Sequence, residues 1–186
     1  HAGRIETLAA LRSDIRQLVD RMLAHGASSA QITHLITLLN DHTVCRVIEL
    51  CIEEQGDPGL PFSWLVFGSE GRREQTLHTD QDNGIAFIGG EDERSRWLAL
   101  AREVNEALDA CGYPLCKGHV MASNPACCLT AAEWQQRFAH WIEHGAPEDL
   151  LNASIYFDLR PLAGNLQLAQ PLRDMLAHER ARVPRF

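Results

Sequence analysis

One stretch of the chain, residues 65–88, constrains the fold more than any other. It joins the apolar runs at residues 62–67 and 83–88 through Gly68-Ser69, a charged segment and Asp80-Gln81-Asp82. The pattern predicts a strand, a tight turn into a short helix, an acidic pair and a second strand. This order brings a phosphate-binding turn and a metal-binding acidic pair to neighbouring strand ends, as a nucleoside triphosphate with Mg²⁺ requires.

The Gly-Ser turn suits a phosphate group. Gly68 has no Cβ, so its backbone can approach an anion closely. We expect Ser69 to be the N-cap of a short helix that starts near Glu70, whose first amides would favour an anion. Arg72 and Arg73 follow within one turn, and a guanidinium matches phosphate with two hydrogen bonds. The sequence does not rank these two arginines.

The acidic pair suits a divalent cation. Asp80 and Asp82 are two positions apart at the start of a predicted strand, so their carboxylates point to the same side. Such carboxylates can hold Mg²⁺, with Mn²⁺ as a second candidate. We expect a third carboxylate from Asp158, the one acidic residue of a predicted strand at residues 154–159, where an unpaired charge would be costly. The alternative is that Asp158 is the structural partner of Arg160 or of another arginine.

The rest of the chain alternates helical and extended patterns. Apolar spacing predicts helices at residues 4–24, from Ser28 or Ser29 to Leu39, and from Asp41 or Thr43 to about residue 54. A turn-rich segment at residues 55–61 then separates an N-terminal helical region, 1–57, from residues 58–186. Later segments predict helices at 91–111, 130–144 and 166–182 and a further strand at 117–121. The prediction is an α+β fold with a small mixed sheet flanked by helices.

The motif resembles that of the polymerase-β nucleotidyltransferase superfamily. Residues 68–83, GSEGRREQTLHTDQDN, are more similar to one branch, a domain family of unknown function found beside CBS and cyclic-nucleotide-binding domains in bacterial signalling proteins. That branch is similar to the glutamine synthetase adenylyltransferases and the PII-protein uridylyltransferases. Asp158-Leu159-Arg160 and residues 112–116, 120–125 and 151–164 also look like this family. One departure is Ala126-Cys127-Cys128, where we would expect an aromatic residue.

The resemblance implies a polymerase-β-type fold and a Mg²⁺-dependent nucleotidyltransferase. Gly68 and Ser69 would bind the triphosphate, and Asp80, Asp82 and Asp158 would carry the metals. The reaction would move a nucleoside monophosphate from an NTP to an acceptor hydroxyl on a protein, in signal transduction. A regulatory CBS or cyclic-nucleotide-binding domain would lie outside this chain. The main alternative is a catalytically silent NTP-binding sensor.

Composition narrows the partners and the compartment. The net charge is −8 and no basic block stands out, which argues against a nucleic-acid surface and against an enzyme that extends RNA ends. No run of about 18 apolar residues exists, so no membrane span is expected. Six cysteines without secretory features indicate reduced thiols in a cytoplasmic protein.

Two other groups of residues have competing interpretations. A structural zinc site is conceivable because Cys116 and His119 have ligand spacing, but buried free thiols are favoured. The residues in question are Cys111, Cys116, His119, Cys127 and Cys128. His78 precedes the acidic pair and could touch substrate phosphate, although a loop position at a helix end is favoured.

Overall fold

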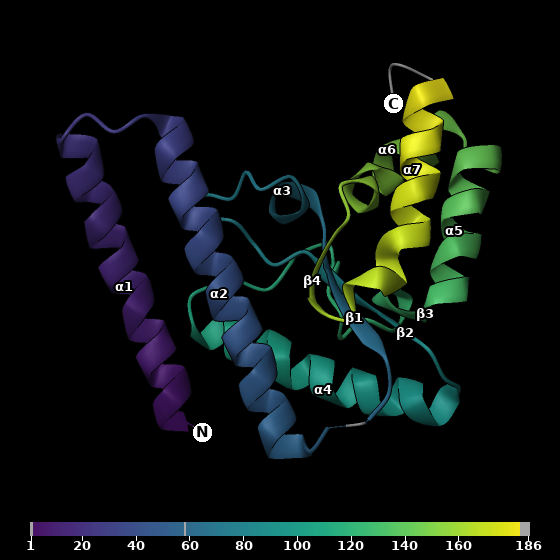
Figure 1. Ribbon diagram of the computed structural model, residues 1–186, viewed down its shortest axis with the longest axis horizontal. Coiled ribbons are helices and arrows are strands. Elements are labelled where there is room, and N and C mark those ends of the chain that lie inside the picture. The colour runs from purple at the N-terminus through teal and green to yellow at the C-terminus, as the bar shows by residue number, and fades with distance from the viewer. Residues whose placement is uncertain (1, 58, 183–186) are drawn as a thin grey trace.

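The computed structural model describes residues 2–57 and 59–182, which form a four-stranded sheet between helices (Figure 1). The strands are β1 (Phe62–Val66), β2 (Asn83–Phe87), β3 (Cys128–Thr130) and β4 (Arg160–Gly164). The α-helices are α1 (Ala2–Ala24), α2 (Ser29–Gln55), α3 (Gly68–Gly71), α4 (Glu91–Ala110), α5 (Ala131–His144), α6 (Pro147–Phe157) and α7 (Gln170–Arg182). Short 3-10 helices lie at η1 (Pro125–Cys127) and η2 (Leu166–Ala169).

The sheet is mixed, and β1 lies inside it. The strand order is β3-β2-β1-β4, with β1 antiparallel to both β2 and β4 and with β3 parallel to β2. The predicted α+β fold with a small mixed sheet flanked by helices is therefore confirmed. The predicted strands at residues 62–67 and 83–88 are confirmed as β1 and β2, each ending one residue earlier.

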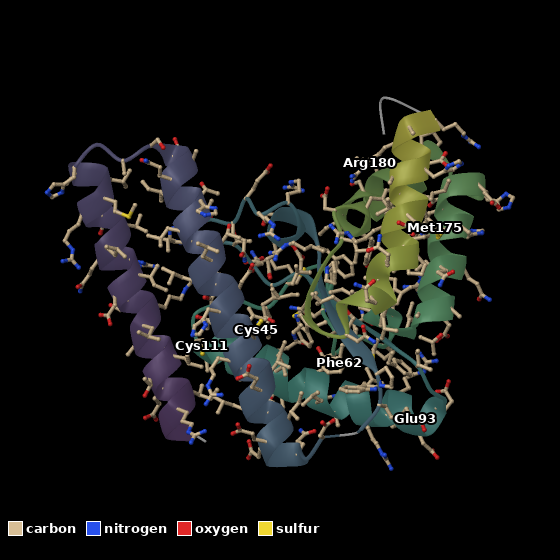
Figure 2. The ribbon with its side chains drawn as sticks, in the orientation of Figure 1. Cys45, Phe62, Glu93, Cys111, Met175 and Arg180 are labelled. Carbon is tan, nitrogen blue, oxygen red and sulfur yellow. The ribbon has the colours of Figure 1, made fainter. Side chains whose placement is uncertain are left out.

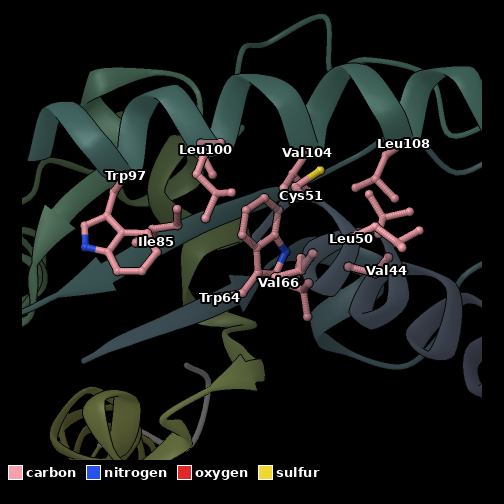
Figure 3. Packing of buried hydrophobic residues seen from close by; sticks show 14 of the residues in the cluster. Val44, Leu50, Cys51, Trp64, Val66, Ile85, Trp97, Leu100, Val104 and Leu108 are labelled. Carbon is pink, nitrogen blue, oxygen red and sulfur yellow. The ribbon is translucent and has the colours of Figure 1, made fainter. Parts of the chain in front are cut away.

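Helices cover both faces of the sheet. Alternate β1 side chains point to opposite faces, so Trp64 packs toward α2 and α4 while Leu65 packs toward α5, α6 and α7. Phe62, labelled in Figure 2, stacks on Trp97 of α4 with ring centroids 4.4 Å apart. Figure 3 shows α4 lying along the sheet, with Trp97 and Leu108 among the buried contacts. Burial on both faces makes β1 and β2 nearly continuous apolar runs.

The second helical segment was predicted wrongly as two helices. Ser28 is an N-cap, as one of the two candidates, and forms a capping box with Gln31, but α2 then continues unbroken to Gln55. The polar residues that suggested a second start have other partners. Thr43 Oγ1 donates to the carbonyl of Leu39 at 3.0 Å, and Asp41 Oδ2 accepts from Nη1 of Arg160 at 2.8 Å.

Two predicted strands are also wrong. Residues 117–121 form a loop, and residues 154–157 belong to helix α6, with Asp158 at its C-terminal cap. An apolar run of this length fits a helical period as well as a strand, and Ala153 and Phe157 are buried four positions apart on one side of α6. The remaining strands of the sheet are β3 and β4, which lie later in the chain than the segments predicted.

The N-terminal helices share a core with the sheet. Leu8 of α1 and Val47 of α2 belong to the same buried cluster as Trp64 and Val104. The division between residues 1–57 and 58–186 stays a prediction, and Pro58 at that division lies outside the described residues. Within the described ranges, every helix is too short or too polar to cross a lipid bilayer.

Candidate functional site

The strand order brings the predicted site segments to one edge of the sheet. Val66, the last residue of β1, pairs with Asn83 at the start of β2 and with Arg160 at the start of β4. The Gly68-Ser69 turn after β1 therefore lies next to the residues that precede β2 and β4. The amide of Phe67 donates to the carbonyl of Asp82 at 3.0 Å and fixes this proximity.

The turn after β1 is a short helix, as predicted, but it begins earlier than expected. α3 spans Gly68–Gly71 and Phe67 is its N-cap, so the prediction that Ser69 caps it is wrong. Gly68 has φ +55°, and a Cβ there would lie 3.0 Å from Oδ2 of Asp82 and 3.2 Å from Cγ1 of Ile155. Only glycine adopts this backbone conformation easily, and its lack of a side chain lets the turn lie against the Asp82 carboxylate.

Carboxylates crowd this edge of the sheet. The pKa of Asp82 is raised to about 6, mainly by burial and also by the charge of Asp80, although the Cys116 hydrogen bond and Arg72 oppose the rise. Glu70 is buried, and the pKa of its carboxyl is raised to about 8, mainly by this burial and also by the charges of Asp82 and Asp41, although the hydrogen bond from the Asp82 amide and the charge of Arg160 oppose the rise. The amide of Asp82 donates to Oε1 of Glu70 at 3.5 Å. Negative charge is therefore costly here unless a cation accompanies it.

The donor set fits a hard divalent cation. Asp80 and Asp82 supply carboxylate oxygens, which Mg²⁺ prefers, and a cation beside them would offset the repulsion that Asp80 exerts on Asp82. Across residues 2–57 and 59–182, however, no three His, Cys, Asp or Glu side chains are arranged to hold one ion. The acidic pair is thus a partial ligand set in this conformation.

Asp158 is held by an arginine. Its Oδ2 accepts from Nη1 of Arg72 at 2.6 Å, and Nε of Arg72 also donates to Glu74 at 3.1 Å. Arg72 is close enough to Asp82 for its charge to lower the pKa of that carboxyl. Arg72 is therefore shared among the carboxylates of the site.

Arg73 differs from Arg72 in its backbone conformation and in its contacts. Its backbone is left-handed, with φ 58°, and its carbonyl accepts from Oγ1 of Thr37 in α2 at 3.2 Å. This contact joins the end of the α3 turn to α2. The structure thus separates two arginines that the sequence does not rank, since Arg72 alone contacts a predicted site carboxylate.

Arg160 has a structural role that the sequence did not identify. Its guanidinium forms a bidentate ion pair with Asp41 of α2, at 2.8 and 3.0 Å. It also donates to the carbonyl of Glu70 at 2.8 Å. Arg160 is buried, so these contacts attach α3 to α2 through β4. Of the two alternatives for the partner of Asp158, Arg160 is wrong, whereas pairing with another arginine is confirmed, since that partner is Arg72.

A buried amide network shapes the start of β2. Nε2 of Gln81 donates to the carbonyls of Asn105 and Tyr113, and Oε1 of Gln81 accepts from Nδ2 of Asn105 at 2.9 Å. Oδ1 of Asn83 accepts from the amide of Ala122 at 2.8 Å. These amides hold residues 113–122 beside Asp82. The only sequence signal for them is the presence of polar residues next to an apolar strand and in a helix face.

Helix α1 also reaches this edge. The Arg12 guanidinium donates to the carbonyl of Leu77 and lies 4.2 Å from the ring centroid of Tyr113. Gly112 has φ +95°, and a Cβ there would lie 2.6 Å from Cδ of Arg12. Arg12 thus joins the loop before Asp80 to the loop after α4, a contact that helical spacing alone does not reveal.

His78 and the cysteines differ in their exposure and in their contacts. His78 is exposed in a turn, and its amide donates to Oγ1 of Thr76 at 3.3 Å. Cys111, Cys127 and Cys128 are buried. The thiol of Cys116 donates to Oδ1 of Asp82 at 3.3 Å, which places it beside the acidic pair.

Comparison with known proteins identifies the family. No curated protein matches the chain. The model of the family described as "Putative nucleotidyltransferase DUF294" matches residues 13–148, well over half of the chain. The match contains the Gly68-Ser69 turn and the Asp80 and Asp82 pair, and it ends before Asp158. The chain belongs to the DUF294 family of nucleotidyltransferase domains.

Proposed function

We propose that this chain is a Mg²⁺-dependent nucleotidyltransferase that moves a nucleoside monophosphate from an NTP to a protein hydroxyl. The observation that carries the proposal is the meeting of the Gly68-Ser69 turn with the Asp80 and Asp82 pair at one sheet edge. A triphosphate needs backbone donors and a cation together, and this edge offers sites for both. The family match supports the reaction class.

The proposed roles follow from position. The Gly68-Ser69 turn binds the triphosphate, and Asp80 and Asp82 hold the ion. When bound, Mg²⁺ or Mn²⁺ supplies the charge that neutralises the triphosphate and polarises the acceptor hydroxyl. The work of the chain is mainly positioning and electrostatic, so no covalent nucleophile on the protein is required.

Asp158 and Arg72 have linked roles in this proposal. Arg72 leaves Asp158 and turns to the phosphates when NTP binds, because guanidinium groups pair well with phosphate oxygens. Asp158 is then free to join the acidic pair as the third carboxylate and to accept the proton of the acceptor hydroxyl. Arg73 takes the phosphate role only if Arg72 does not.

The acceptor and the setting come from the resemblance to adenylyl- and uridylyltransferases of signalling pathways. We place the acceptor on a protein and the chain in signal transduction, next to a regulatory domain outside this sequence. The six cysteines are unpaired. Unpaired thiols fit the reducing conditions of the cytoplasm, where we place the protein.

The test is pyrophosphate release. Purified protein is incubated with Mg²⁺ and with ATP, UTP, CTP or GTP in turn, together with a cell extract from which the acceptor can be labelled. We expect one NTP to give metal-dependent pyrophosphate and a labelled protein band. The Asp80→Asn/Asp82→Asn variant should give neither, and equal labelling by this variant would contradict the proposal.

The second candidate is an NTP sensor without turnover. The observation that favours it is the ion pair between Arg72 and Asp158, which keeps the third carboxylate away from the acidic pair. A sensor would bind one NTP with Mg²⁺ as tightly as an enzyme does. It would release no pyrophosphate with any acceptor source, and this result distinguishes the two candidates.

A further inference from the structure

A cavity of about 620 Å³ opens at the C-terminal end of α3, between that helix, the end of α6 and α7. Figure 2 labels Arg180 of α7, one of its lining residues, on the side of α7 that faces α6. Its volume is in the range of sites that bind small ligands or single side chains. Among the residues that line it are Gly71, Arg72, Asp158, Arg173, Asp174 and Arg180.

The cavity reaches the candidate site from the end of α3 away from the triphosphate turn. Gly71, Arg72 and Asp158 line it, whereas Gly68 and Ser69 do not. Gly71 lets α3 pack against the backbone of Asp158, since a Cβ at Gly71 would lie 1.9 Å from the carbonyl oxygen of Asp158. A molecule in this cavity would therefore meet the proposed proton acceptor without occupying the phosphate turn.

The cavity carries available positive charge on an acidic protein. Arg72 is matched by Asp158 and Glu74. Arg173 makes no hydrogen bond or ion pair to the described residues. Arg180 donates one hydrogen bond, to the carbonyl of Phe157 at 3.2 Å, and that partner carries no net charge.

The acidic lining does not cancel this charge. Asp158 is paired with Arg72, while Asp174 keeps its negative charge because its hydrogen-bond partner at 2.8 Å, Gln170, is neutral. Arg173 and Arg180 are thus opposed by Asp174 alone, which leaves an excess of one positive charge among the lining residues to meet an anionic ligand. This local excess of positive charge contrasts with the net charge of −8 of the chain.

We propose that this cavity is the acceptor subsite, and that it selects a protein segment whose hydroxyl residue is flanked by carboxylates. The inference rests on the proposed function and adds the class of acceptor. Arg173 and Arg180 would pair with the flanking carboxylates, since guanidinium groups bind carboxylates with two hydrogen bonds. The hydroxyl between them would then lie at Asp158.

The transfer balances with the groups named. The hydroxyl oxygen of the acceptor bonds to the α-phosphorus of the NTP, and its proton passes to the Asp158 carboxylate. The bond from the α-phosphorus to the oxygen that bridges to the β-phosphorus breaks, and pyrophosphate leaves with that electron pair. No oxidant or further reactant is needed.

The test uses two fluorescent peptides and no NTP. One has a tyrosine between two glutamates on each side, and the other has glutamine in place of every glutamate. Fluorescence anisotropy gives the affinity of each for the whole chain. We expect the acidic peptide to bind more tightly, and Arg173→Gln to weaken it about twofold to fivefold, the scale of an exposed ion pair.

A matched control comes from the same helix. Arg182 lies on α7, pairs with Glu179 and does not line the cavity, so Arg182→Gln removes the same charge elsewhere. It should leave binding of the acidic peptide unchanged. Equal binding of the two peptides, or equal effects of Arg173→Gln and Arg182→Gln, would overturn the proposal. Displacement of the acidic peptide by inorganic phosphate at the same concentration would indicate a general anion site and would also overturn it.

A second variant separates this inference from the proposed function. Asp80→Asn/Asp82→Asn should bind the acidic peptide as the unmodified chain does, because neither residue lines the cavity. If no NTP binds the unmodified chain while the acidic peptide binds through Arg173, the proposed function fails, and with it the role of the cavity as an acceptor subsite, although the cavity still binds acidic segments. If NTP binds and the peptides are not distinguished, the cavity assignment fails alone.

Discussion

Arg72 and Asp158 are 86 positions apart in the chain, and the guanidinium of Arg72 donates to Oδ2 of Asp158 at 2.6 Å. The contact joins the end of α3 to the residue that precedes β4. Arg72 also pairs with Glu74 and acts electrostatically on Asp82. One exposed cation is thus shared by carboxylates from three segments of the candidate site.

The two neighbouring arginines should differ in their effect on NTP binding. Arg72→Gln should weaken NTP binding by about tenfold, the loss expected for a charge-assisted hydrogen bond. Arg73→Gln is the matched control, because the carbonyl of Arg73 faces Thr37 and its side chain does not pair with a site carboxylate. Calorimetric titration of Mg²⁺-NTP into each variant measures this. A larger loss in Arg73→Gln would reverse the assignment.

Gly71 should not tolerate a methyl group. A Cβ there would lie 1.9 Å from the carbonyl oxygen of Asp158, so Gly71→Ala should lower the free energy of unfolding by about 1–3 kcal/mol. Gly118→Ala is the control, since the nearest atom to its Cβ is 3.9 Å away. Urea denaturation compares the two. An unchanged midpoint for Gly71→Ala would show that α3 and Asp158 are packed less closely than described.

The buried pair of Arg160 and Asp41 should be strongly coupled. Arg160→Met leaves Asp41 and the Glu70 carbonyl without their donor, and should lower the free energy of unfolding by about 3–5 kcal/mol. Asp41→Asn/Arg160→Met should cost less than the sum of the single changes, because the charge left unpaired is removed. Denaturation of all three variants closes the cycle. Additive losses would mean that the pair is not coupled.

The Glu133 carboxylate should stabilise the fold only at pH values above its folded-state pKa. Burial alone would raise its pKa, but hydrogen bonds from Thr130 and Arg94 outweigh that effect and lower the pKa below 4.5. A lowered folded-state pKa adds stability above about pH 4.5, and this is lost as the pH falls through the folded pKa. Because the pair with Arg94 is partly exposed, Glu133→Gln should cost about 1 kcal/mol or less near neutral pH. Urea titrations should show this difference shrinking in acid, and a constant difference would contradict the assignment.

Much of the site could be predicted because its signals are local. The order of the Gly68-Ser69 turn and the Asp80 and Asp82 pair requires only two strands that pair as neighbours. The Ser28 cap depends on Gln31, three positions away, and the capping box confirms Ser28 as one of the two candidates. Such short-range patterns can be recognised in the sequence because they do not depend on contacts with distant segments.

The errors share a different cause. Asp41 looks like a helix-start residue, but its partner is Arg160, 119 positions away. The apolar run at residues 154–157 fits the period of a strand and that of a helix. The helix is formed because Ala153 and Phe157 pack in one cluster with α5 and the sheet. Long-range contacts of this kind are not visible in sequence spacing.

The central claim is that Asp80 and Asp82 hold the cation that accompanies an NTP at the Gly68-Ser69 turn. The most direct measurement is thermal unfolding of the unmodified chain and of Asp80→Asn/Asp82→Asn, with and without Mg²⁺ and each NTP. We predict stabilisation of the unmodified chain by one NTP, by about 2.7 kcal/mol at 100 times its Kd, only when Mg²⁺ is present. The double variant should show none. Equal stabilisation of both proteins, or none of the unmodified chain by any NTP, would contradict the claim.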